Sequence, residues 1–168
     1  MGLKQAVIDK LGIVESDLIN QFVADVCEIF TTMVLIDDIK YLVKEVEVSN
    51  HFTESVTAMV GLAGTYNGIV CMHTSQTLAQ VFTARMLGMD EEEVENDVSD
   101  ALGEIVNMIS GSFKHQLSKG GSDIQLSTPS VVTGSDYSFF SGNPGHTLAF
   151  LFSSKGEEFI ISVVLEMN

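Results

Sequence analysis

The feature that most constrains the fold is a long helical pattern in the second half of the chain. Apolar residues recur there at steps of three and four, the spacing that places them on one buried face of an α-helix. Asp100, Glu104 and Asn107 recur at the same steps and form a separate polar stripe. The pattern predicts an amphipathic helix over residues 90–119 with a polar ridge. Its apolar stripe comprises Val94, Val98, Ala101, Leu102, Ile105 and Ile109.

The other patterns predict an α+β chain of two related halves, each with a long helix and about three strands. A first helix is expected over residues 15–35, with Ser16 as its N-cap and a buried stripe that ends at Met33. A second helix, residues 75–87, has Ser75 as N-cap and Gly88 after its end. Strands are expected over residues 39–49, 55–63, 68–74, 124–132, 146–153 and 158–166, with a turn at Asn67-Gly68.

Pro129 lies inside the strand expected over residues 124–132. Proline has no backbone N–H to donate to a neighbouring strand, so this strand is expected at a sheet edge or broken at the proline. A connection rich in glycine and serine is expected to follow over residues 134–145.

Composition predicts one domain over residues 1–168. Hydrophobic residues make up 45% of the chain, which suits a well-filled core, and none of the apolar runs is long enough to span a bilayer. The net charge of −15 disfavours binding to nucleic acids and to anionic membranes, because both are negatively charged. The first residues lack the features of a signal peptide, so a cytoplasmic location is expected.

No metal site is predicted. The four histidines are scattered, and Cys27 and Cys71 are expected to be buried free thiols. No glycine-rich nucleotide loop is predicted either, because Gly61-x2-Gly64 lacks the lysine of a P-loop and is typical of a turn.

The polar ridge has two interpretations. A glutamate on a helix is most often a solvated surface residue, and the same holds for Glu104. Asparagine and glycine, however, are unfavourable in the interior of a helix, so the presence of Asn107, Gly103 and Gly111 there needs an explanation. Glycine removes side-chain bulk, which permits either the approach of another surface or tight packing within the core.

The spacing Asp100-x3-Glu104-x2-Asn107, followed by Pro129, resembles the signature of the CheC/CheX/FliY family of chemotaxis phosphatases. The segment Phe30-Thr31-Thr32-Met33 is similar to the end of the first helix in CheX-like members. The resemblance covers residues 15–166 and implies a CheC-like fold, with two long helices packed on an antiparallel-rich sheet.

The resemblance also implies an activity: accelerated loss of the aspartyl phosphate of a CheY-like response regulator. Glu104 would pair with the receiver's lysine, and Asn107 would orient the hydrolytic water. Asp100 and Pro129 would support this motif. The receiver would supply Mg²⁺, so no cofactor is expected in this chain. Thr31 stands where a second motif would have asparagine, which implies one catalytic centre per chain and a CheX-like homodimer.

Two alternatives remain open from the sequence. The first alternative is a non-catalytic module that binds the phosphorylated receiver. The second is a structural component of a chemotaxis or motor-switch assembly. Phosphoryl lifetime and binding, measured together, distinguish these from a phosphatase.

Overall fold

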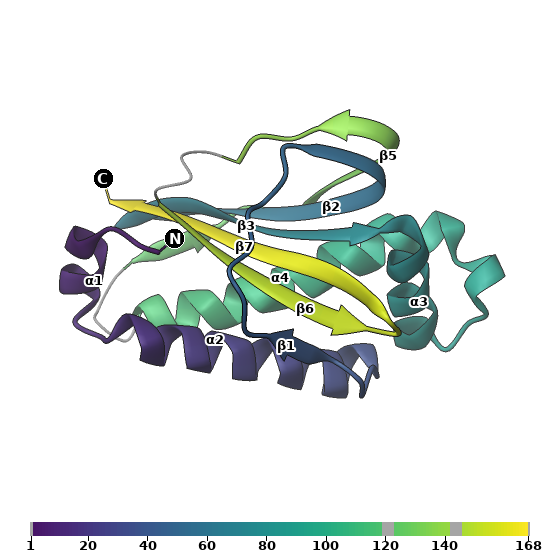
Figure 1. Ribbon diagram of the computed structural model, residues 1–168, viewed down its shortest axis with the longest axis horizontal. Helices are drawn as coiled ribbons and strands as arrows, with labels where there is room; N and C mark the ends of the chain where they lie inside the picture. Colours follow the sequence, from purple (N-terminus) through teal and green to yellow (C-terminus); the bar gives the residue numbers. More distant parts are fainter. Residues whose placement is uncertain (1, 119–122, 142–145, 168) are drawn as a thin grey trace.

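The computed structural model is an α+β fold in which the helices pack around one antiparallel sheet (Figure 1). It describes residues 2–118, 123–141 and 146–167. The helices are α1 (Gln5–Leu11), α2 (Glu15–Ile29) with a π-helical continuation (Phe30–Val34), α3 (Gln76–Leu87), two 3₁₀ turns (Glu91–Glu93, Glu95–Asp97) and α4 (Val98–Ser118). The strands are β1 (Lys40–Leu42), β2 (His51–Gly64), β3 (Tyr66–Ser75), β4 (Ile124–Leu126), β5 (Ser130–Ser138), β6 (Thr147–Ser154) and β7 (Glu157–Met167).

The sheet has the strand order β1-β6-β7-β3-β2-β4, and β5 also pairs with β2. The long strand β2 therefore serves two partners: β4 pairs with its residues 62–64 and β5 with its residues 51–59. The linker between β4 and β5, which contains Pro129, lies between these two pairings. The prediction of an edge strand broken at Pro129 is confirmed.

The core lies between the sheet and the two long helices. Phe22 of α2 contacts Phe113 of α4 and Phe150 of β6, with ring centroids 5.5 and 4.7 Å apart. Alternate residues of β2, namely Val56, Ala58 and Val60, are buried beneath them. Figure 1 shows α4 running behind the strands, α2 along the lower border and α3 at the right. The expected pair of long helices on an antiparallel sheet is confirmed.

Hydrogen bonds also join α2 to α4. The Asp25 carboxylate of α2 accepts hydrogen bonds from Ser112 Oγ and Gln116 Nε2 of α4, each 2.7 Å long. A further 2.8 Å bond, from Gln21 Nε2, occupies the other oxygen of Asp25. These bonds hold the two helices in one register.

Several predicted boundaries are confirmed by local geometry. Ser75 caps α3, since its Oγ accepts a 3.0 Å hydrogen bond from the backbone N–H of Leu78. Gly88 ends the same helix with φ 66°, a left-handed conformation that glycine adopts without strain. The last two strands form the expected hairpin, which turns at Lys155 and Gly156.

The first long helix differs from its prediction at both ends. It begins at Glu15 after Val14, so Ser16 lies inside the helix and is not its N-cap. At the other end it widens into the π-helical segment, which Leu35 terminates with φ 65°. Because the wider turn rotates the side chains out of register, Met33 is 53% exposed instead of buried.

The motif helix begins later than predicted. Residues 91–97 form 3₁₀ turns, because the buried Val94 adopts φ −102° and ψ 3°, outside the α-helical region. The helix proper starts at Val98 and is described to Ser118, so its predicted end at Lys119 lies outside the described residues.

Three strand predictions also need correction. The strand expected over residues 39–49 contains only Lys40–Leu42, because the chain turns away from the sheet after Leu42. The first hairpin turns at Gly64 and Thr65, whereas Asn67-Gly68 lies within β3. β5 extends to Ser138, into the segment expected to be a connection, because it pairs with the first half of β2. The relation of the two halves as a sequence repeat stays a prediction.

Candidate functional site

The candidate site is the outward face of α4. The opposite face of this helix is buried as predicted, so the orientation of the helix is fixed by its apolar stripe. The stripe residues Val98, Ala101, Leu102, Ile105 and Ile109 are at most 8% exposed, as is Val94 in the turn before the helix. Asp100 and Glu104 are exposed and Asn107 is half-buried, so the polar stripe forms a ridge at the surface.

The ridge residues are adjacent on the helix. Successive residues differ by about 100°, so Asp100, Glu104 and Asn107 lie one above another. Among the described residues, neither Glu104 nor Asn107 makes a side-chain hydrogen bond or ion pair with another. Both side chains are therefore available to a partner without first breaking an internal bond.

Pro129 lies against α4 immediately beside this ridge. A Cβ atom added at Gly103 would be 3.4 Å from Pro129 Cβ and 3.7 Å from Val131 Cγ2. The linker between β4 and β5 therefore packs directly on the helix at Gly103, one residue before Glu104. Of the two explanations for this glycine, the structure favours internal packing, although the added Cβ would lie at ordinary van der Waals distance.

The same linker is anchored to the sheet at its other side. The backbone N–H of Ser127 donates to the carbonyl of Gly61 at 2.9 Å, and Ser127 Oγ accepts a 2.8 Å hydrogen bond from the backbone N–H of Gly61. Ser127 could not be identified as an anchor from local sequence patterns, because this pairing joins residues 66 positions apart. The linker thus fixes the position of Pro129 relative to α4.

The surroundings of the ridge are strongly acidic at one end. The exposed residues Glu91, Glu92, Glu93 and Glu95 precede the helix N-terminus, whose partial positive charge favours carboxylates. The basic residues of α4, Lys114 and His115, lie beyond Asn107 toward the other end. A cationic group on a partner would therefore complement Glu104.

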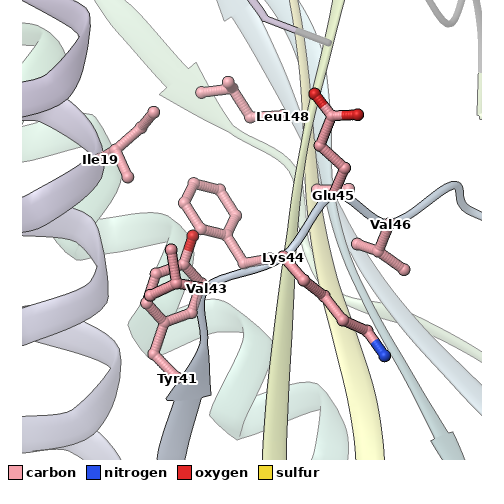
Figure 2. Close-up of a pocket in the computed structure, with 9 residues that line it drawn as sticks. Ile19, Tyr41, Val43, Lys44, Glu45, Val46 and Leu148 are labelled. Carbon is pink, nitrogen blue, oxygen red and sulfur yellow. The ribbon is translucent and has the colours of Figure 1, made fainter.

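A cavity lies away from the ridge. It has a volume of about 390 Å³ and lies between α2 and the end of β1. Ile19, Tyr41 and Leu148 are among its lining residues (Figure 2). The charged ends of Lys44 and Glu45 point away from each other in this view. No residue of the ridge lines this cavity. In the described part of the chain, no group of three or more His, Cys, Asp or Glu side chains is placed to hold a metal.

A histidine on the sheet has an unusual environment. His73 follows the core residue Met72 in β3, so its side chain points to the opposite face of the sheet. Its Nδ1 lies 2.9 Å from Thr57 Oγ1. Its ring stacks on Phe52, with centroids 4.6 Å apart. Burial lowers the pKa of His73 to about 4, so this side chain is neutral at physiological pH. His73 Nε2 is buried and has no hydrogen-bond partner among the described residues.

Both cysteines are free, as expected, but only Cys71 is buried, and Cys27 is half-buried. Burial raises the pKa of both thiols, that of Cys71 to about 12, which keeps the Cys71 thiol protonated at neutral pH. No helix of the described residues is long and apolar enough to cross a membrane.

Comparison with known proteins defines the class. In structure, the chain is similar to a chemotaxis protein CheX from Desulfovibrio desulfuricans, with TM-score 0.74 and 29% identity over 89% of this chain and 99% of that one. The CheX protein of the CheX-CheY-BeF3-Mg+2 complex from Borrelia burgdorferi shares the fold, with TM-score 0.71 and 21% identity over 89% of this chain and 97% of that one. The chain therefore has the CheC-like α+β fold.

The family follows from the sequence match. The family described as "Chemotaxis phosphatase CheX" matches residues 56–151, which include Asp100, Glu104, Asn107 and Pro129. This chain belongs to that family. It is also 29% identical over 83 residues to the CheY-P phosphatase CheX of Thermotoga maritima; that match spans 49% of this chain and 54% of the relative.

Proposed function

We propose that this chain accelerates the dephosphorylation of a phosphorylated CheY-like response regulator. The observation that carries the proposal is the exposed ridge of α4, on which Glu104 and Asn107 are adjacent and free of internal partners. The family match supports the reaction class. The Borrelia fold relative, which is in a complex with CheY, is consistent with the partner class.

In this mechanism Glu104 supplies affinity. Its carboxylate forms an ion pair with a lysine of the receiver, and this contact offsets the repulsion from a chain with a net charge of −15. The pair becomes desolvated as the two surfaces meet, which strengthens it relative to an exposed ion pair. Asp100, one turn earlier, and Pro129 hold the local shape of this contact.

Asn107 supplies the chemistry. Its carboxamide oxygen accepts a hydrogen bond from water while its N–H groups donate to a neighbouring acceptor, which orients the water in line with the phosphorus atom. The side chain is uncharged, so it does not repel the phosphoryl group. Mg²⁺ and the aspartyl phosphate belong to the receiver, and this chain is expected to need no cofactor of its own.

The test uses purified protein and a panel of phosphorylated receivers. We expect faster loss of phosphate from at least one receiver, at concentrations of the protein far below that receiver. Tight binding with an unchanged phosphoryl lifetime would favour the binding module instead. Stable incorporation into a large assembly, with no change in phosphate loss, would favour the structural component.

We also propose that the chain forms a homodimer. The strand β5 pairs only with β2 among the described residues, so its other edge is open to a second copy. Light scattering coupled to size-exclusion chromatography distinguishes a dimer of about twice 18.2 kDa from a monomer.

A further inference from the structure

A glycine on the ridge has no role within the chain. Gly111 lies well inside α4, where glycine is less favourable than any residue except proline. Among the described residues, a Cβ atom added there would meet nothing within 4 Å, and the backbone is not left-handed at this position. Neither internal packing nor backbone conformation therefore requires glycine. Gly103, eight residues earlier, is the opposite case, because Pro129 occupies the space beside it.

The position of Gly111 is the second part of the argument. It follows Asn107 by four residues and Glu104 by seven, so it lies on the same face, about one helical turn beyond Asn107. Here the ridge surface descends to the helix backbone itself. The ridge is therefore a row of three polar side chains, Asp100, Glu104 and Asn107, followed by a depression at Gly111.

We infer that Gly111 is the point of closest approach between α4 and the phosphorylated receiver. The inference rests on the proposed function, since the receiver is the occupant of this face. Asn107 must reach a phosphoryl group buried in the receiver, so the rim of that pocket has to come close to the helix beside it. A side chain at position 111 would meet this rim, whereas glycine lets the backbones approach.

The test compares Gly111→Ala and Gly111→Gln with the unaltered protein. The probe is a CheY-type receiver loaded with beryllofluoride and Mg²⁺, chosen as the receiver whose phosphate loss the unaltered protein accelerates most. We expect Gly111→Gln to weaken binding about tenfold or more, and Gly111→Ala to weaken it less, because added bulk disrupts a close-packed contact. Both variants should unfold at a denaturant concentration equal to or above that of the unaltered protein.

Ser99→Gln is the matched control. Ser99 is exposed on the same helix, five residues before Glu104, and points away from the ridge. We expect it to leave receiver binding within twofold. Receiver binding by Gly111→Gln that equals binding by the unaltered protein would overturn the inference, as would a loss of folding stability in Gly111→Ala.

The inference and the proposed function fail differently. If Asn107→Ala abolishes acceleration while the Gly111 variants bind normally, the function stands and the close approach is wrong. If the unaltered protein accelerates phosphate loss from no receiver, both are wrong.

Discussion

The helices α2 and α4 pack side by side on the same sheet, but they differ at the surface they present. On α4 a glutamate and an asparagine lie three residues apart on a regular helix, at Glu104 and Asn107. On α2 a glutamate and a threonine have the same three-residue spacing, at Glu28 and Thr31, and both are exposed. Thr31 lies in the π-helical segment, where the spacing of side chains differs from that of an α-helix. The helix α2 therefore differs from α4 in the spacing of its side chains as well as in lacking the asparagine.

This difference suggests why only one of the two helices is expected to act on a receiver. Both helices bury an apolar stripe and both expose polar residues, so burial alone does not distinguish them. Pro129 packs beside the ridge of α4, next to Gly103, and the motif of Glu104 and Asn107 lies only on this helix. We therefore expect one working face per chain.

The largest effect is expected from Asn107→Ala. Loss of the carboxamide removes the group that orients water, so the rate of receiver dephosphorylation should fall about 100-fold or more. Folding should be unchanged, since Asn107 makes no side-chain hydrogen bond with the described residues. Phosphate release is the readout and Thr31→Ala on α2 is the matched control, with an expected change below twofold. Equal losses in both variants would remove the distinction between the helices.

Lowering the pH should reduce the stability of the whole fold, including both helices, through a histidine of the sheet on which they pack. The pKa of His73 is lowered to about 4 in the folded protein, below its ordinary value near 6.5. The unfolded chain therefore binds a proton more readily, and stability falls as the pH decreases from about 6.5 toward 4, by on the order of 3 kcal/mol in all.

Urea unfolding between pH 7.5 and 4.5 checks this expectation. His73→Gln should show a smaller decrease in the free energy of unfolding over that range, because its side chain does not titrate. Identical pH dependence in the two proteins would show that His73 is not the group responsible.

An intermediate effect is expected from Glu104→Ala. Removing the carboxylate deletes the ion pair with the receiver's lysine, and KM should rise roughly 30-fold with little change in kcat. Glu28→Ala removes the same charge from α2 and should leave KM within about twofold. A fall in kcat without a change in KM would assign Glu104 a role in the chemical step instead.

The smallest effect is expected from restoring the missing amide on α2. Thr31→Asn, made together with Asn107→Ala, should recover almost none of the lost rate, because the π-helical segment does not place residue 31 above Glu28 as Asn107 is placed above Glu104. Phosphate release at high protein concentration is the readout. Substantial recovery would show that side-chain identity matters and helix geometry does not.

The sequence was sufficient for the parts of the fold that depend on local periodicity. It predicted the buried stripe of α4, the cap at Ser75 and the break at Pro129, because each is determined by a few neighbouring residues. It did not predict the π-helical segment or the short β1, because both are involved in contacts between residues far apart in the sequence. Arg85 Nε donates to the carbonyl of Leu35 at the end of the π-helical segment, and β1 pairs with β6.

For the candidate site, the ridge residues were identifiable from spacing, but their surroundings were not. Whether Gly103 and Gly111 serve the same purpose depends on what lies next to each, and that is set by tertiary packing. The structure separates them: one glycine admits Pro129 and the other faces open space.

The most direct test is to map the contact surface by NMR during titration with a beryllofluoride-loaded receiver. Backbone amides of residues 100–111 and the side-chain amide of Asn107 should shift or broaden on binding, while those of Glu28 and Thr31 remain unchanged. Perturbations centred on α2, with the α4 signals unmoved, would contradict the account.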